Sequence, residues 1–232
     1  MNILGIIPAR GGSKGVLGKN IKLLGEKPLI CYTIDATKDS KLLNEVILSS
    51  DDDEIMAVAN ELGLKIPFKR PDNLATDESP TIDTVIHALE YYKSNGITFD
   101  AVCLLQVTNP FRTGKFIDEA ITKFQNSNTD SLISVLEVPH EYNPHWIFEE
   151  NTNGNLKIST GEEKIITCRQ NLPTSFYRDG SIYIAKVEVI MKQRSLYGKS
   201  ISYILADKDR HVNIDTMKDW KIAEELVEKL ND

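Results

Sequence analysis

Short apolar runs alternate with segments of helical periodicity along most of this chain, and this alternation restricts the folds available to it. Between the runs, apolar residues recur at helical spacing, for example at Ile55, Val58, Ala59 and Leu62. Alternation of this kind is typical of βαβ units, which form a mostly parallel sheet with helices on both faces. The apolar runs that we predict to be strands span residues 2–8, 45–50, 64–69, 101–107, 131–138 and 180–185.

The predicted fold class is therefore α/β, a Rossmann-like three-layer αβα sandwich. At 232 residues, of which 41% are hydrophobic, the chain is long enough for one compact core, so we predict a single domain over 1–232. One segment departs from the alternation, because apolar residues flank an Asn153-Gly154 turn signal within 145–158. We expect an inserted β-hairpin there, in a protruding subdomain over 140–178 that serves as a dimerisation arm.

Charge and cysteine content narrow the function classes. The formal net charge is -7, which argues against a nucleic-acid binder, since such domains are usually basic. Cys31, Cys103 and Cys168 are widely spaced and odd in number, so they indicate a reducing compartment rather than a disulfide framework or zinc site. The N-terminal run resembles a core strand more than a signal peptide, and no run is long enough to span a membrane. We expect a cytoplasmic protein without a membrane partner.

The first apolar run leads into a loop that is both glycine-rich and basic, "IIPARGGSKGVLGKN" over 6–20. It carries four glycines interleaved with Arg10, Lys14 and Lys19, whereas a turn that only reverses the chain needs one or two. Glycines let the backbone approach a ligand closely, and cations with N–H donors favour an anion. The loop matches neither G-x-x-x-x-G-K-[ST] nor G-x-G-x-x-G. It predicts a local anion site of another type.

Further polar loops follow the other predicted strands: "SSDDDEI", "KRPDNLATDESPT" and "QVTNPFRTG". The carboxyl ends of parallel strands meet at one edge of a sheet, where ligands bind. We interpret the acidic run Asp51, Asp52 and Asp53 mainly as a helix start stabilised by the macrodipole, not as a metal site. Asp77 and Ser79 suit either helix N-capping near Pro80 or ligand contact.

The segment "IIPARGGSKGVLGKNIKLLGEKPLICYTI" resembles the opening of the acylneuraminate (sialic acid) cytidylyltransferase family, whose pattern is roughly I-P-A-R-x-x-S-K-G-x-x-x-K-N. The resemblance continues through "VILSSDDDEI", "FKRPDNLATDESPTIDTVIHAL", "LLQVTNPFRTG", "RQNLPTSFYRDGSIYI" and "VNIDTMKDW", in order and over nearly the whole chain. It implies an enzyme that couples CTP to a nine-carbon 2-keto sugar acid (a sialic, legionaminic or pseudaminic acid), releasing pyrophosphate. It also implies a homodimer.

The resemblance assigns the triphosphate and the charge on leaving pyrophosphate to Arg10, Lys14 and Lys19. It assigns the base pocket to Arg70. The full set of nucleotide contacts that it implies is Arg10, Gly12, Ser13, Lys14, Lys19, Asn20, Arg70, Asp77 and Ser79.

For the sugar acid, the resemblance implies contacts from Gln106, Arg169, Gln170 and Arg178, with Arg169 meeting the carboxylate. Arg178 lies two residues before a glycine where some members have three. The segment "LLQVTNPFRTG" departs from the commoner L-L-Q-P-T-S-P-L-R-T, and its Arg112 either contacts sugar or fastens the following helix. His145 either influences sugar specificity or packs within the hairpin.

The family commonly carries D-I-D-T near the C-terminus, with both carboxylates near Mg²⁺, and this chain has Asn213, Ile214 and Asp215. In an extended segment, residues two apart face the same side. We expect Asp215, with the amide oxygen of Asn213, to hold Mg²⁺ more weakly, and we count Asp215 among the catalytic residues with Arg10, Lys14 and Lys19; a structural role for Asp215 is the alternative.

Two other functions remain open from the sequence. One is a cytidylyltransferase for the eight-carbon acid 3-deoxy-octulosonate, whose pattern I-P-A-R-x-x-S-x-R-L-P-G-K-P differs from "SKGVLGKN". The other is a nucleotide-sugar binding or regulatory protein with weakened catalysis, because Asn213 replaces a carboxylate.

Overall fold

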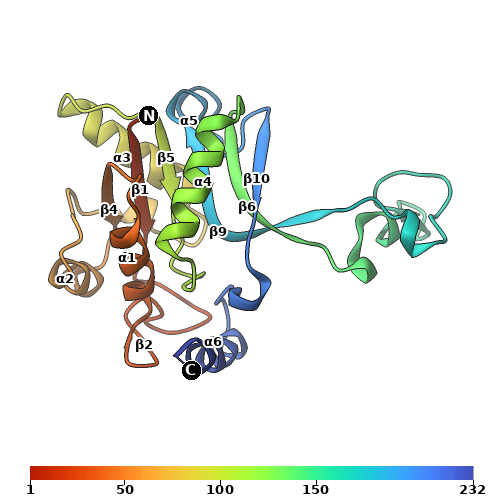
Figure 1. Cartoon of the computed structure of the whole chain (residues 1–232), viewed down its shortest axis with the longest axis horizontal. Coiled ribbons are helices and arrows are strands. Elements are labelled where there is room, and N and C mark those ends of the chain that lie inside the picture. The colour runs from red at the N-terminus through yellow and green to blue at the C-terminus, as the bar shows by residue number, and fades with distance from the viewer. Residues whose placement is uncertain (232) are drawn as a thin grey trace.

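A computed structural model describes residues 1–231 of the chain. Within this range six strands form one sheet in the order β10-β6-β9-β5-β1-β4 (Figure 1). These strands are β1 (Ile3–Pro8), β4 (Glu45–Ser49), β5 (Ala101–Leu104), β6 (Ser131–Glu137), β9 (Phe176–Lys186) and β10 (Ile201–Leu205). The helices are α1 (Leu29–Asp39), α2 (Asp53–Glu61), α3 (Thr81–Ser94), α4 (Gly114–Asn126), α5 (Val187–Gln193) and α6 (Met217–Asn231).

Shorter elements connect these. Two small antiparallel pairs are β2 (Leu23–Leu24) with β3 (Lys27–Pro28), and β7 (Phe148–Glu150) with β8 (Leu156–Ile158). The single-turn 3₁₀ helices are η1 (Asp72–Leu74), η2 (His140–Tyr142), η3 (Pro144–Trp146), η4 (Arg169–Asn171) and η5 (Lys208–Arg210).

The central strands are buried on both faces, which explains why they appear in the sequence as continuous apolar runs. In β1, Ile3 and Ile7 join a core with residues of α1, α2, α4 and α6, while Leu4 and Ile6 join a second core with α3 and α5. The sheet thus lies between two helical layers. The predicted three-layer α/β fold is confirmed.

Strand directions also agree with the expectation, with one exception. β1 pairs in parallel with β4 and β5, and β10 with β6, but β9 is antiparallel to both β5 and β6. The predicted strand over 64–69 is wrong: only Lys65 forms an isolated parallel bridge, to Ile47. Pro67 follows two residues later, and a proline has no N–H with which to continue the ladder.

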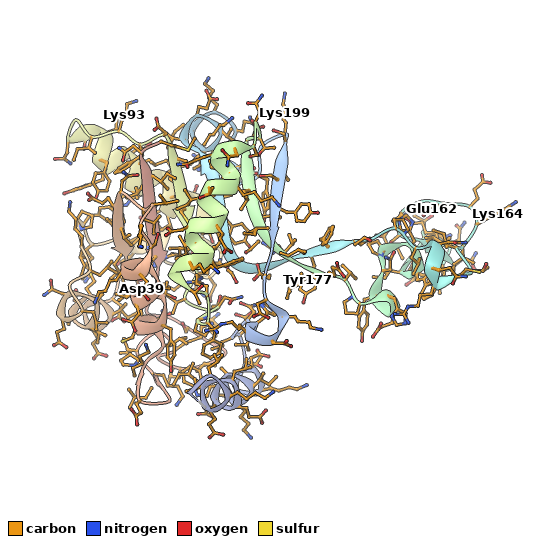
Figure 2. The ribbon with its side chains drawn as sticks, viewed as in Figure 1. Asp39, Lys93, Glu162, Lys164, Tyr177 and Lys199 are labelled. Atoms are coloured by element: carbon orange, nitrogen blue, oxygen red, sulfur yellow. The ribbon has the colours of Figure 1, made fainter. Side chains whose placement is uncertain are left out.

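An arm extends from the sheet where β6 and β9 run on beyond the neighbouring strands (Figure 1). The N–H of Val138 donates to the carbonyl of Ser175 at 2.9 Å, so the arm departs and returns at this point. Figure 2 shows Glu162 and Lys164 at the far end of the arm and Tyr177 on its stalk.

The hairpin expected in this arm is present, because β7 and β8 pair antiparallel and Gly154 adopts a left-handed φ of 77° between them. Trp146 lies in η3 before the hairpin, and its Nε1 donates to the carbonyl of Ile166 at 2.6 Å. None of the helices within residues 1–231 is long and apolar enough to cross a membrane.

Candidate functional site

A cavity of about 390 Å³ lies at the carboxyl ends of β1 and β5, where the glycine-rich loop meets three other segments. It gathers most of the predicted nucleotide residues from segments far apart in the sequence. The predicted residues that line it are Arg10, Ser13, Lys14, Lys19, Asn20, Arg70, Asp77, Ser79, Gln106 and Asp215. Gly12 is not among the lining residues, and a side chain placed there would meet no atom within 4 Å.

The glycine-rich loop lies against the segment that carries Asp215. A Cβ on Gly15 would be 1.9 Å from the Asp215 carbonyl oxygen, so only glycine permits this approach. Val16 is buried in the core, and Asn20 Nδ2 donates to the carbonyl of Arg10 at 2.9 Å. Asn20 therefore shapes the loop and also lines the cavity. These contacts hold the basic residues at the base of the cavity.

Lys19 is the least exposed lysine of the loop, with 12% of its side chain accessible. Its Nζ donates to the carbonyl of Ile214 at 2.7 Å and lies 3.5 Å from Asp215 Oδ1. Burial lowers the pKa of Lys19, and the charge of Asp215 opposes that shift. The arrangement fixes a cation on the floor of the site, where its interactions are screened less than those of a surface lysine.

Arg70 is buried beside the same cavity. Its Nη1 donates to Thr84 Oγ1 at 3.2 Å and its Nη2 to Asp51 Oδ1 at 3.3 Å, while Nε has no partner among the described residues. Burial lowers the pKa of Arg70, and Asp51 counteracts this. The guanidinium is thus held in one orientation.

The interpretation of the acidic run needs correction at Asp51. Asp52 does cap α2, accepting from the N–H groups of Glu54 at 2.9 Å and Ile55 at 3.0 Å. Asp51 instead pairs with Arg70 and accepts from the N–H of Gly11 at 3.2 Å. Its role comes from tertiary contacts that the sequence pattern did not indicate.

Helix capping is wrong for both Asp77 and Ser79. Pro80 is the N-cap residue of α3 and no side chain caps the helix. Ser79 Oγ donates to the carbonyl of Asn73 at 2.9 Å, within the loop itself. Asp77 forms ion pairs with Arg10 and Lys14 across the cavity.

Gln106 joins this cavity to a neighbouring one of about 270 Å³, which it also lines. Arg178 lines this second cavity, and its Nη1 donates to Tyr197 Oη at 3.2 Å. Tyr183 and Arg194 lie in the same wall. Two of the four predicted sugar residues, Gln106 and Arg178, therefore lie together next to the nucleotide residues.

The other two predicted sugar residues lie elsewhere. Arg169 and Gln170 belong to η4 in the arm, where both are exposed, and neither lines the two cavities. His145 also belongs to the arm and pairs with Glu162 Oε1 at 2.5 Å, which agrees with its packing alternative.

The Arg112 side chain forms hydrogen bonds that connect two segments of the chain. Its Nη1 donates to Thr33 Oγ1 at 3.0 Å and its Nη2 to the carbonyl of Gln106. Burial lowers the pKa of Arg112 to about 10. This side chain links α1 to the segment that carries Gln106, so its contacts are structural, but they go to α1 and not to the following helix α4 as the alternative expected.

The two predicted metal residues lie side by side at the edge of the cavity. Asn213 Nδ2 donates to Asp215 Oδ2 at 2.6 Å. Nearby Asp219 is occupied, accepting from the N–H groups of Asp215 at 3.1 Å and Thr216 at 2.7 Å. In the part of the chain that the structure describes, no cluster of three or more His, Cys, Asp or Glu side chains is placed to hold a metal. Mg²⁺ commonly binds through one or two carboxylates plus substrate phosphates, so this sparse set fits it.

Four threonines that line the cavity were not predicted from the sequence: Thr76, Thr81, Thr84 and Thr108. Thr108 accepts from the N–H of Ile214 at 2.8 Å through its carbonyl, which ties the loop after β5 to the segment of Asp215. Backbone hydrogen bonds of this kind cannot be inferred from the pattern of side chains, although the position of Thr108 just after β5 was a usable signal.

Comparisons with known sequences identify one family, and a comparison with solved structures shows a shared fold. The profile of a family described as cytidylyltransferase matches residues 4–230. The chain is 37% identical to the CMP-N,N'-diacetyllegionaminic acid synthase of Legionella pneumophila, over 98% of this chain and 97% of that protein. It is 31% identical to a pseudaminic acid cytidylyltransferase of Campylobacter jejuni, over 97% and 96%. A solved CMP:2-keto-3-deoxy-manno-octonic acid synthetase complexed with CTP shares the fold, with a TM-score of 0.74 at 14% identity over 99% and 100% of the two chains.

Proposed function

This chain belongs to the cytidylyltransferase family, and we propose that it transfers CMP from CTP to the anomeric hydroxyl of a nonulosonic acid, giving a CMP-sugar and pyrophosphate. The single observation that carries the proposal is the cavity in which Arg10, Lys14 and Lys19 converge beside Gln106 and Asp215. It presents cations to a polyanion on one side and a hydrogen-bonding amide to a polyol on the other.

In this reaction the 2-hydroxyl of the sugar acid attacks the α-phosphorus and pyrophosphate leaves in line. Positioning and electrostatic stabilisation account for most of the catalysis in phosphoryl transfer, because negative charge grows on the leaving group. Arg10 and Lys14 hold the triphosphate, and Lys19 stabilises the charge from the floor of the site. Arg70 provides the fixed edge of the base pocket. Gln106 and Arg178 orient the sugar acid.

Mg²⁺ is part of the proposal. Asp215, with the amide oxygen of Asn213, would hold the ion together with phosphate oxygens of CTP. When bound, it neutralises phosphate charge and lowers the pKa of the attacking hydroxyl. The substitution at Asn213 removes one negative charge from the site, so the required Mg²⁺ concentration should be higher than with two carboxylates.

We infer that the active unit is a homodimer. Arg169 and Gln170 cannot be assigned to the cavity of their own chain, yet they lie exposed on an arm that extends away from the sheet (Figure 1). Exposed apolar side chains are concentrated on that arm and on the edge strand β10, including Leu156, Ile165 and Tyr203. A partner copy would cover these groups and place the arm residues near the sugar subsite.

The cytoplasm is the proposed location. Cys31, Cys103 and Cys168 are all free within the described residues, which is typical of a reducing compartment.

The experiment that tests the function measures pyrophosphate release from CTP and Mg²⁺ against a panel of acceptors, with the product identified by mass. The panel holds sialic, legionaminic and pseudaminic acids, and 3-deoxy-octulosonate as the eight-carbon competitor. A CMP-nonulosonate product supports the proposal. Turnover of only the eight-carbon acid would assign the chain to the alternative enzyme.

An Asn213→Asp variant addresses the regulatory alternative. In an active enzyme adapted to the amide, the change lowers the Mg²⁺ concentration needed for half-maximal rate and leaves kcat within a few-fold. A wild-type protein that binds CTP without turnover, and that gains a large kcat from this substitution, would instead be a binding protein with decayed catalysis.

A further inference from the structure

The cations assigned to the triphosphate already have an anionic partner within the chain. Asp77 accepts from Arg10 and also pairs with Lys14, so one carboxylate bridges two residues of the glycine-rich loop. These two cations hold the pKa of Asp77 below its usual value, with Lys14 contributing most. A carboxylate in this position offers oxygens to the same donors that phosphate oxygens would use.

The segment that carries Asp77 is a loop bounded by Pro71 and Pro80. Its other polar contacts are internal: the N–H of Leu74 donates to the carbonyl of Pro71 at 2.9 Å, and Ser79 closes back on Asn73 and on Thr76. Among the polar contacts of the described residues, Asp77 is the one that ties residues 72–79 to the glycine-rich loop.

Exposure distinguishes this bridge from the other two ion pairs at the cavity. The difference lies in the cations: Arg10 and Lys14 are 32% and 82% exposed, whereas Lys19 and Arg70 are 12% and 5% exposed. Their carboxylate partners do not separate in this way, because Asp77, Asp215 and Asp51 are 39%, 62% and 21% exposed. Ion pairs in contact with solvent are weak and exchange readily, while buried ones are costly to break. The bridge at Asp77 is therefore the one that a phosphate can replace.

We propose that Asp77 is an internal competitor for Arg10 and Lys14, which limits how tightly the polyphosphate is held and speeds the departure of pyrophosphate. The inference rests on the proposed function, because it concerns the triphosphate subsite of that reaction. Pyrophosphate leaves through the subsite that gripped it as part of CTP. As pyrophosphate departs, Asp77 forms its ion pairs with Arg10 and Lys14 again. These contacts within the chain replace the contacts to pyrophosphate, which would otherwise dissociate slowly.

The test compares Asp77→Asn with Asp72→Asn. The control removes the same charge from the same loop, at an exposed residue with no contact to Arg10 or Lys14. Binding of CTP and of pyrophosphate, each with Mg²⁺, is measured by calorimetry, and product inhibition by pyrophosphate is measured at steady state. For Asp77→Asn we expect both ligands to bind about fivefold more tightly and the inhibition constant of pyrophosphate to fall by a similar factor. Because release then slows, KM for CTP and kcat should fall together.

The opposite result is equally clear. If Asp77 merely supports the shape of the site, Asp77→Asn raises KM for CTP and weakens pyrophosphate binding, and the proposal is overturned. Equal behaviour of the two variants also overturns it. Failure of the proposed function looks different, since the wild-type protein would then neither bind CTP nor form a CMP-sugar. Asp77→Glu, which keeps the charge, should stay close to wild type in pyrophosphate inhibition.

Discussion

At the scale of single residues, the cavity shows how a protein with a net charge of -7 can offer a site to a polyanion. Each cation that lines the cavity has an acidic partner: Arg10 and Lys14 share Asp77, Lys19 has Asp215 and Arg70 has Asp51. The pairs whose cation is buried, at Lys19 and Arg70, fix its orientation, and the pairs whose cations are exposed can exchange. The charge that the cavity presents to a ligand therefore depends on which ion pairs the ligand can displace, not on the net charge of the protein.

Lys19 is the residue whose loss should affect rate most. We expect Lys19→Ala to lower kcat about 100-fold or more while the fold persists, because a cation preorganised on the floor of the site no longer meets the charge on the leaving group. Lys93→Ala is the control for charge, since Lys93 lies in the last turn of α3 (Figure 2) and does not line the cavity. Steady-state kinetics and circular dichroism of both variants provide the measurement. Near-normal turnover of Lys19→Ala would remove its assigned role.

Two glycines of the same loop make a matched pair. A Cβ on Gly15 would lie 1.9 Å from the Asp215 carbonyl, and a Cβ on Gly12 would meet nothing within 4 Å. Gly15→Ala must therefore push the loop away from Asp215, and displacement of this order can cost about 100-fold in rate. Gly12→Ala should stay within a few-fold of wild type. The comparison of kcat/KM for CTP tests this, and equal effects at both positions would contradict the close approach.

At the scale of elements, the sequence pattern correctly predicted the strands that are buried on both faces of the sheet. β1, β4, β5 and β6 lie close to the predicted runs, because a strand covered on both sides must be apolar throughout. The pattern failed where a run cannot pair along its length or where a strand lies exposed at the edge of the sheet. Pro67 interrupts the run over 64–69, and β10 was not predicted because it is an edge strand whose Tyr203 and Leu205 are exposed.

The site was predictable to a similar extent. Residues of the glycine-rich loop could be assigned because composition and position agree there. The partnership of Asp51 with Arg70 depends on how β4 and the loop before η1 meet in space, which no local pattern records. Arg169 lies within the arm that the sequence did predict, but its absence from the cavities of its own chain is a property of the fold.

β9 supplies a prediction at this scale. Its pairing with β6 is irregular between Ile133 and Val135, and at that point Gly180 adopts a φ of 89°. A Cβ there would lie 3.5 Å from Gln106 Oε1 and 3.9 Å from Asn213 Oδ1, so the irregular strand forms the surface beneath both. Irregularities of this kind often direct side chains at active sites.

We expect Gly180→Ala to lower the free energy of unfolding by about 1–2 kcal/mol, the usual cost of a left-handed conformation for a residue with a side chain. We also expect it to raise KM for the sugar acid, because a backbone that relaxes from the left-handed conformation shifts the surface against which Gln106 packs. Gly63→Ala carries the same backbone penalty at a φ of 73°, remote from the cavity. Chemical denaturation should show similar losses for the two variants, while only Gly180→Ala alters KM. Identical kinetics would show that β9 does not position Gln106.

At the scale of the whole molecule, the arm is difficult to explain within one chain. It buries little apart from Asn143 and Ile158, and it carries Arg169 and Gln170 outward on η4. A two-fold dimer is the simplest symmetric arrangement in which each copy gives an arm and receives one. In such a dimer the loop cations of one protomer and Arg169 of its partner would complete a single site.

Mixing two inactive variants tests this composition directly. Lys19→Ala removes a group from the body of the molecule, and Arg169→Ala removes one from the arm. If the arm serves the partner, a heterodimer of the two contains one site with both defects and one site with neither. After subunit exchange, half of the dimers are mixed, so an equimolar mixture should recover about one quarter of wild-type activity. If each arm instead serves its own chain, every site in the mixture carries one defect and no activity returns. Light scattering before and after exchange confirms that dimers are present, and a mixture of Lys19→Ala with Gly15→Ala is the control, since both changes lie in the body and cannot complement through the arm.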